Sequence, residues 1–549
     1  MTLPPQDEGR KVFAYGIVLL ALPFLLASAN PLWLNNSPDD WDVWMYYGYF
    51  NHLFQFSNHN IWPENAYIGT RIPYILPGYI VHALFGEENY KYIFGICVIY
   101  PSIAFSYFYI LRKYLPLEAA AATTVLIALN FYLLRSIGWD YVDRGEAAYE
   151  ALTFALLTLA GSARRPWIAT IGAGFAAASM VFVHLATGLL FPVFLLYSGF
   201  VVRRAGSFRA WTAHTGHLLL FGSLGAALAQ LVFGSLLVLL HGGDFFFILR
   251  QVQVVPTNFG AWNEPLPFLM TQGYWITLHL AAFIGAGLAL IAGRLRPELA
   301  SRTRFETFWL CVITIGFAVL FCGEVSHRLF FFSRVGLYAT MFIPFSMIGF
   351  GILLFRTPSP GLFAVTAAVA TGSVLLRLGI QDGDGLSAFL KIPVPVLGIA
   401  IGGLLALAFV RRRPAVTLAA LVMLGLLDGF NSWHFTEDRT VRVAHARIAS
   451  EIGGNLPTVF YNRDDPQLPT IHGILASFTD RALYPARDTY PVGRADLRRG
   501  DSVVVLSSRE DSMDGAQSTL LRLVGQAAPI DSFRAGDIWV HVFTVTAGR

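Results

Sequence analysis

The chain has 549 residues, of which 55% are hydrophobic and only 13% are charged, with a formal net charge of +4. A soluble globular protein carries about 25% charged residues, so this composition excludes a soluble protein for most of the chain. We expect an α-helical polytopic membrane protein, and nothing in the charge pattern indicates a nucleic-acid partner.

The N-terminus carries the basic pair Arg10 and Lys11, followed by an apolar run to about Ala29 without a convincing cleavage site. This pattern predicts an uncleaved first helix. A spanning helix needs about 20 apolar residues. That criterion predicts about 13 helices, near 12–33, 92–111, 117–135, 148–162, 167–185, 187–202, 215–240, 274–293, 306–322, 335–355, 361–379, 393–410 and 415–430. The shorter apolar segment 73–85 predicts an interfacial helix.

Basic residues gather in one set of alternate loops, which predicts that these loops are cytoplasmic. They include Arg10-Lys11, Arg112-Lys113, Arg164-Arg165, Arg203-Arg204-Arg209, Arg294-Arg296-Arg302-Arg304, Arg356 and Arg411-Arg412-Arg413. The outer loops 34–91 and 136–147 then face the external or periplasmic side of the inner (plasma) membrane. An odd number of helices places the C-terminus on the same outer side.

The composition becomes that of a soluble protein after the last predicted helix. We expect a transmembrane domain over 1–433 and a soluble external domain over 434–549. Segments 458–461, 502–506 and 538–543 predict strands and 514–525 predicts a helix, which together indicate a small α/β domain.

Three carboxylates, Asp39, Asp40 and Asp42, lie where the first predicted helix leaves the membrane. Clustered carboxylates repel one another, which raises the pKa of at least one and suits it to proton abstraction. They could equally hold a divalent cation such as Mg²⁺ or Mn²⁺, or cap a helix. We favour Asp42 over Asp40 as a catalytic base, because Asp42 shares a helix face with Tyr46, and Asp39 as the cap.

The second outer loop holds another acidic cluster, Asp140, Asp143 and Glu146. On a helix these three side chains would share one face. Capping could account for some of them, but two acidic clusters on consecutive outer loops point to a shared site.

Three arginines on the outer side could bind an anion, since the guanidinium fork matches phosphate geometry. They are Arg71 near the end of the first loop, and Arg328 and Arg334 at a predicted helix mouth. The alternative is that each extends to the membrane interface only to keep its charge in water.

These features resemble the GT-C membrane glycosyltransferases, in particular the group of protein mannosyltransferases and aminoarabinose transferases. The resemblance covers the whole layout and uses four short motifs: Asp42-Val43-Trp44-Met45-Tyr46-Tyr47, the basic and proline-containing segment 71–78, the second-loop acid Asp140 or Asp143, and Arg334-Val335-Gly336-Leu337-Tyr338 followed by Pro344. The first loop lacks the Asp-Glu pair of mannosyltransferases, and the tail lacks the Trp-Trp-Asp motif of oligosaccharyltransferases. Those differences favour a bacterial polysaccharide- or lipid-modifying subclass.

The resemblance implies a hexosyl- or pentosyltransferase that moves a sugar, with inversion, from a polyprenyl-phosphate donor to a hydroxyl of a lipid, glycan or protein. It implies a loop carboxylate as base (Asp42, Asp40, Asp140 or Asp143) and arginines on the donor phosphate. Tyr46 and Glu146 are expected to contact substrate. The resemblance implies no cofactor of its own, and the divalent cation considered above stays an alternative role for the carboxylates.

Two other functions stay open. A transporter or flippase of lipid-linked glycans would carry charges deep in its helices, and the predicted helices hold few. A non-catalytic partner in glycan assembly would not need the acidic clusters, although these discriminate only weakly.

Overall fold

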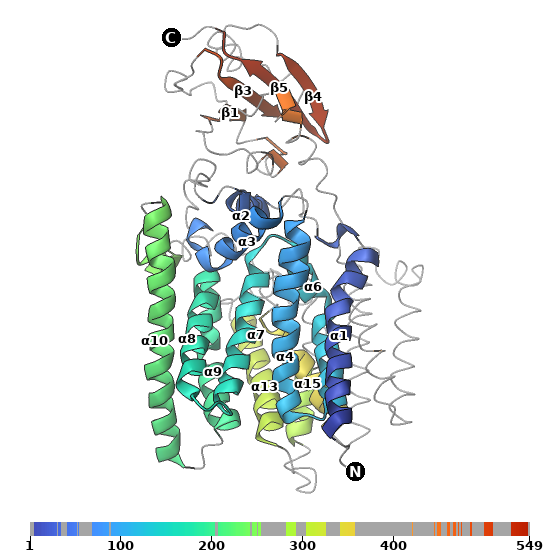
Figure 1. Ribbon diagram of the computed structural model, residues 1–549, viewed down its shortest axis with the longest axis vertical. Helices are drawn as coiled ribbons and strands as arrows, with labels where there is room; N and C mark the ends of the chain where they lie inside the picture. The colour runs from blue at the N-terminus through green and yellow to red at the C-terminus, as the bar shows by residue number, and fades with distance from the viewer. Residues whose placement is uncertain are drawn as a thin grey trace.

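The computed structural model describes residues 5–29, 31–34, 41–51, 53, 68–86, 89–203, 207–241, 244–249, 251–253, 282–291, 303–325 and 341–356, and separate short stretches between 420 and 546. Its helices form one bundle, and a sheet formed by the C-terminal part of the chain lies beyond one end of it (Figure 1). Helices α2 and α3 lie at that same end, whereas the N-terminus lies at the other. This arrangement agrees with the prediction that the two ends of the chain lie on opposite sides of a membrane.

The helices follow in chain order. They are α1 (Pro5–Ala29), η1 (Pro31–Leu34), α2 (Trp41–Asn51), η4 (Ile68–Thr70), α3 (Ile72–Phe85), η5 (Tyr92–Ile99), α4 (Tyr100–Tyr114), α5 (Leu117–Ala128), α6 (Phe131–Gly138), α7 (Val142–Ala160), α8 (Pro166–Val183), η6 (Leu185–Leu190), α9 (Phe191–Leu196), η7 (Tyr197–Val202), α10 (Phe208–His241), a helix at Ala282–Ile291, α13 (Arg304–Val325) and α15 (Ile343–Arg356).

Within the described residues, five helical segments are long and apolar enough to cross a membrane. They are Glu8–Ser28, Tyr92–Tyr114, Pro166–Val183, Leu185–Val202 and Phe208–Leu239. The predicted helices 361–379, 393–410 and 415–430 fall almost entirely outside the described residues, so the predicted total of about 13 spans stays a prediction.

The predicted helix 117–135 is wrong as one continuous span, because the chain breaks it into α5 and α6. Leu129 leaves the helical conformation, with φ −97° and ψ 5°. The amide of Asn130 then donates to the carbonyl of Ile127 at 3.0 Å, a tighter turn than an α-helix makes. A hydrogen bond of 2.6 Å from Trp33 Nε1 to the carbonyl of Leu134 attaches α6 to η1.

The second outer loop is shorter than predicted, because α7 begins at Val142 instead of near residue 148. Tyr141 is extended and Asp143 follows in the first turn, where its negative charge is favourable near the positive end of the helix dipole. Asp143 and Glu146 therefore lie on a helix, whereas Asp140 precedes it.

Helix α3 confirms the predicted helix over 73–85. It begins after Arg71, whose carbonyl accepts the amides of Tyr74 at 3.0 Å and Ile75 at 3.1 Å. Pro73 occupies the first turn, where its missing amide proton costs no intrahelical bond.

Helices α8 and α10 pack closely because glycines face backbone across their interface. A Cβ on Gly174 would meet the backbone of Gly222, and a Cβ on Gly225 would meet the carbonyl of Ile171. Small residues of this kind let helices approach within a membrane, where no hydrophobic force drives them together.

The C-terminal sheet has five strands in the order β2-β1-β3-β5-β4. Strand β1 (Thr458–Tyr461) is parallel to β2 (Tyr484–Pro485) and β3 (Ser502–Ser507), whereas β5 (Ile538–Thr544) is antiparallel to β3 and to β4 (Asp531–Ala535). The three predicted strands are confirmed. The predicted helix 514–525 lies outside the described residues, and the domain boundary at 433 stays a prediction.

Candidate functional site

The start of α3, the start of α7 and the outer end of α8 meet at the end of the bundle beneath α2 (Figure 1). The hydroxyl of Tyr149 on α7 donates to the carbonyl of Pro73 at 2.9 Å, which joins the first turn of α3 to α7. Residues from the first loop, the second loop and the end of a later helix therefore surround one buried region.

Arg71 is the predicted site arginine that lies in this region, and it is buried with 8% of its surface exposed. Its Nη1 donates to the hydroxyl of Tyr46 on α2, and its guanidinium carbon lies 5.9 Å from the centre of that ring. The preceding residue, Thr70, accepts a hydrogen bond of 2.9 Å from Gln251 Nε2. Arg71 immediately precedes α3, and the backbone hydrogen bonds of that helix fix the position of its Cα.

Asp140 belongs to a network of fully buried residues. Its Oδ1 accepts a charge-assisted hydrogen bond of 2.6 Å from Arg144 Nη2, and its Oδ2 accepts one of 2.6 Å from the hydroxyl of Tyr90. The ammonium of Lys91 lies 4.0 Å from Oδ2. Arg144 Nε also donates to the hydroxyl of Tyr74 at 2.8 Å, which connects the network to α3. These contacts hold both carboxylate oxygens of Asp140.

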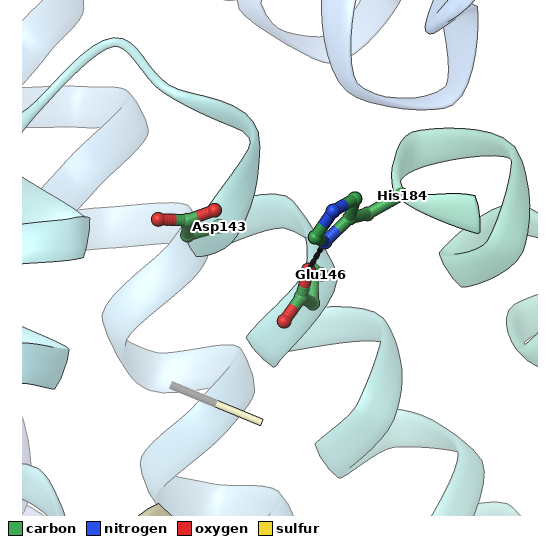
Figure 2. A group of neighbouring side chains, drawn as sticks. All are labelled: Asp143, Glu146 and His184. Carbon is green, nitrogen blue, oxygen red and sulfur yellow. Dashed lines mark hydrogen bonds and ion pairs between the residues drawn. The ribbon is translucent and has the colours of Figure 1, made fainter. Parts of the chain in front are cut away.

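Asp143, Glu146 and His184 form a second buried group beside this network. One ligand atom from each lies within 4.8 Å of the other two. Figure 2 shows the two carboxylates on one helix and the imidazole from another segment, with the contact between His184 Nδ1 and Glu146 Oε2 dashed. Two carboxylates and an imidazole are a ligand set that suits a divalent metal ion.

His184 is held by the backbone at the end of α8. It is extended, with φ −148° and ψ 108°, and its amide donates to the carbonyl of Met180 at 2.9 Å. Its carbonyl accepts both the amide of Thr187 at 3.1 Å and the hydroxyl of Thr187 at 2.7 Å. Burial, and then the positive charge of Arg71, lower the pKa of His184 to about 3.

The structure brings four of the predicted site residues together in two pairs. Arg71 contacts Tyr46, and Asp143 lies near Glu146. Asp140 instead joins the Arg144 network, so the three second-loop acids do not act as one face. Asp42 is the second residue of α2, but the structure does not describe its side chain. Asp40, Arg328 and Arg334 lie outside the described residues.

Two residues of the region were missed by sequence analysis, His184 and Arg144. His184 stands 38 positions from Glu146, so no linear spacing connects them. The available signal was topological, because His184 ends the predicted helix 167–185 on the same outer side as the acidic loop. Arg144 lies four residues after Asp140, a spacing at which opposite charges pair on a helix.

No protein-family model matches the sequence, and no curated protein matches it. The structure is similar to ArnT from Cupriavidus metallidurans bound to undecaprenyl phosphate, with a TM-score of 0.50 and 15% identity over 96% of this chain and 98% of that one. It is also similar to ArnT of the same organism in the apo state, with a TM-score of 0.45 and 13% identity over 96% of this chain and 99% of that one.

At this level of identity the likeness to the undecaprenyl-phosphate-bound structure concerns the fold. The chain therefore shares the overall fold of ArnT along almost its whole length. The fold and the apolar helices together support an integral membrane protein.

Proposed function

We propose that the chain is a membrane glycosyltransferase that moves a sugar from a polyprenyl-phosphate donor to an acceptor hydroxyl, with inversion, on the outer face of the inner membrane. The ArnT-like fold supports this, since one of the similar structures holds undecaprenyl phosphate. The sugar is a hexose or a pentose, and the acceptor is a lipid, a glycan or a protein.

One observation supports this function above the others. Arg71 is buried at the start of α3, and Gln251 connects the preceding residue to the end of α8. His184 lies there with Asp143 and Glu146. An anion-binding cation and a pair of carboxylates thus share one region. Transfer from a lipid phosphate requires both, because a negative charge develops on the leaving phosphate while the acceptor loses a proton.

In the proposed reaction a carboxylate takes the proton of the acceptor hydroxyl. The oxygen attacks the anomeric carbon from the face opposite the phosphate, the bond to the phosphate oxygen breaks, and the lipid phosphate leaves. Arg71 stabilises the charge that develops on it, with Arg334 and Arg328 as further candidates.

Asp42 is our proposed base, with Asp40 as the alternative, and Tyr46 positions Arg71 against the substrate. Asp140 already binds Arg144 and Tyr90 through its two oxygens, so Asp143 is the better candidate among the second-loop acids for orienting the acceptor or sharing a divalent cation. Glu146 accompanies Asp143 in that role.

The test is a transfer assay with purified chain, radiolabelled polyprenyl-phosphate sugars and envelope acceptors. Asp42→Asn should lower turnover by about 100- to 10,000-fold, the range for losing a general base. Asp39→Asn, at the expected helix cap, should mainly lower thermal stability. If Asp40→Asn is inactive and Asp42→Asn keeps more than about a tenth of turnover, the base is Asp40. Full activity of both variants would contradict a catalytic base in the first loop and would remove the main support for the proposed reaction.

A flippase of lipid-linked glycans is the second candidate, and a buried polar pair favours it. The hydroxyl of Tyr107 on α4 donates to Glu150 Oε1 on α7 at 2.9 Å, and both side chains are fully buried between the helices. Ionisable residues within a helix bundle often mark a transport path. Translocation of a labelled lipid-linked sugar in proteoliposomes that Glu150→Gln abolishes, without any transfer activity, would establish this function instead.

A further inference from the structure

We infer that Asp143, Glu146 and His184 form a binding site for one first-row transition-metal dication, of the Zn²⁺ or Mn²⁺ type. The ligand site stands on its own geometry, whereas its use beside the donor phosphate rests on the proposed function.

The geometry of the three side chains suits one ion. Their ligand atoms lie within 4.8 Å of one another. Zinc binds nitrogen and oxygen at about 2.0–2.2 Å, so two ligands of one tetrahedral ion stand about 3.5 Å apart. Side-chain movements of up to about 1.3 Å would bring the three ligand atoms to that spacing. An ion placed there would replace the present contact between His184 and Glu146.

The ligands come from two elements that the fold holds in place. Asp143 and Glu146 are three residues apart on α7 and share a helix face. His184 is anchored by Met180 and Thr187 at the end of α8. Preorganised backbones of this kind lower the entropy lost when the ion binds. Three protein ligands leave further positions for water or a substrate oxygen, as in catalytic zinc sites.

The charges of the region also favour a dication. Asp143 and Glu146 are both 0% exposed, and their carboxylates lie close enough to repel each other. In the neighbouring network a permanent cation, Arg144, balances Asp140 at 2.6 Å. A divalent ion between Asp143 and Glu146 would reduce their mutual repulsion, while the imidazole contributes no charge in its ligand form.

The imidazole decides the class of metal. Mg²⁺ and Ca²⁺ prefer oxygen ligands throughout, and Mg²⁺ retains several waters. Imidazole suits zinc and the neighbouring transition metals, and carboxylates suit manganese. A set of one nitrogen and two carboxylate ligands therefore favours Zn²⁺ or Mn²⁺ over the Mg²⁺ that carboxylates alone would suggest.

Under the proposed function, this ion would lie near Arg71. Gln251 Nε2 donates to Thr70 Oγ1 at 2.9 Å and to the carbonyl of Phe182 at 3.0 Å. These two bonds tie the residue before Arg71 to the end of α8 before His184. Together the ion and Arg71 would bind a phosphate oxygen more tightly than either alone.

Metal binding by the full-length chain in detergent tests the inference without any activity assay. After treatment with EDTA and removal of the chelator, the protein is titrated with ZnCl₂, MnCl₂ and MgCl₂ by calorimetry, and bound metal is counted by mass spectrometry. We expect close to one Zn²⁺ or Mn²⁺ per chain and much weaker binding of Mg²⁺. His184→Ala and Glu146→Gln should each weaken Zn²⁺ binding at least tenfold.

Two variants serve as matched controls. His214→Ala removes a part-buried histidine that bonds Ser198, and Glu150→Gln changes the buried acid one turn beyond Glu146. Both should bind Zn²⁺ like the wild type. Because a variant could misfold, zinc X-ray absorption of the wild-type chain provides a second readout, and one imidazole should appear among the nearest ligands.

Less than a tenth of an equivalent of bound metal, unchanged binding in His184→Ala, or a zinc spectrum without imidazole would each overturn the inference. The contact between His184 and Glu146 would then be a hydrogen bond alone. Transfer activity that persists in EDTA would leave the proposed function standing without the metal. If the chain binds zinc through His184 but transfers no sugar, the proposed function is contradicted and the metal site stands.

Discussion

Arg71 combines a permanent positive charge with burial at the start of α3. A surface arginine can keep its guanidinium in water by extending past an apolar stem. Arg71 is instead buried, donates to Tyr46 and lies under α2. The planar guanidinium fork matches the geometry of phosphate oxygens, and this match is the reason that Arg71 is our candidate for the lipid phosphate.

Replacement of Arg71 by Ala should weaken binding of undecaprenyl phosphate by about 1.5–3 kcal/mol, or roughly 10- to 150-fold, the value of a charged hydrogen bond. Lysine should restore part of the loss, because it keeps the charge but lacks the fork. Calorimetry of the purified variants measures the effect. Arg304→Ala, which removes an arginine stacked 5.6 Å from the Phe200 ring, is the control. Unchanged affinity in Arg71→Ala would assign Arg71 to packing.

Asp140 and Asp143 are three residues apart and should differ in what they contribute. Removing one partner of a buried ion pair costs about 3–5 kcal/mol, because the other charge stays buried. Asp140→Asn leaves Arg144 in that state, so it should lower the melting temperature strongly. Asp143→Asn leaves the ion pair of Asp140 and Arg144 intact, and we expect a smaller change in melting temperature with a large loss of transfer. Equal destabilisation by both substitutions would contradict this division.

At the scale of elements, the contact between α3 and α7 assembles the region. Gly145 lies between Arg144 and Glu146 on α7, and a Cβ there would lie 2.7 Å from Cδ2 of Tyr74 on α3. The ring of Tyr74 occupies the space that a larger residue would need. Its hydroxyl accepts the hydrogen bond from Arg144 Nε. The glycine thus brings the loop that carries Arg71 close to the acids of α7.

Gly145→Ala should destabilise the chain by about 1–3 kcal/mol, the usual cost of overpacking a closely packed contact. Thermal unfolding in detergent, followed by the loss of monodisperse protein, measures this effect. Gly216→Ala on α10 is the matched control, since a Cβ there meets nothing within 4 Å and alanine favours a helix. A Gly145→Ala chain as stable as the control would mean that α3 shifts without cost.

At the scale of the whole molecule, the bundle has two different ends. The end that carries α2, α3 and the site also carries the C-terminal sheet, whereas the N-terminus lies at the opposite end (Figure 1). The basic pairs Arg10-Lys11 and Arg164-Arg165 lie in loops of the predicted cytoplasmic set. The site should therefore face outward, where the sugar of a lipid-linked donor leaves the bilayer.

Alkaline phosphatase fused after Arg549 should be active, and the same enzyme fused after Arg165 should be inactive, because it requires disulfides that form outside the cytoplasm. Activity on intact cells measures the orientation, and protein levels of both fusions are the control. Activity only in the fusion after Arg165 would reverse the orientation and move the site to the cytoplasmic face.

Composition and local pattern predicted the membrane class and three strands of the C-terminal sheet. These properties depend on the neighbours of a residue in sequence. Twenty apolar residues require lipid wherever they occur, and a run such as 502–506 predicts a buried strand without knowledge of its partners. The sequence and the family resemblance also indicated Arg71 and Tyr46 as expected site residues, and these two side chains are in contact.

Tertiary structure alone decided which acids act together. Asp140, Asp143 and Glu146 look equivalent in sequence, yet α7 begins between the first and the second of them. Asp140 consequently pairs with Arg144, while Asp143 and Glu146 face His184, which another helix brings from 38 residues beyond Glu146. A partner chosen by helix packing leaves no spacing in the sequence, because the packing depends on side chains distributed over the whole bundle.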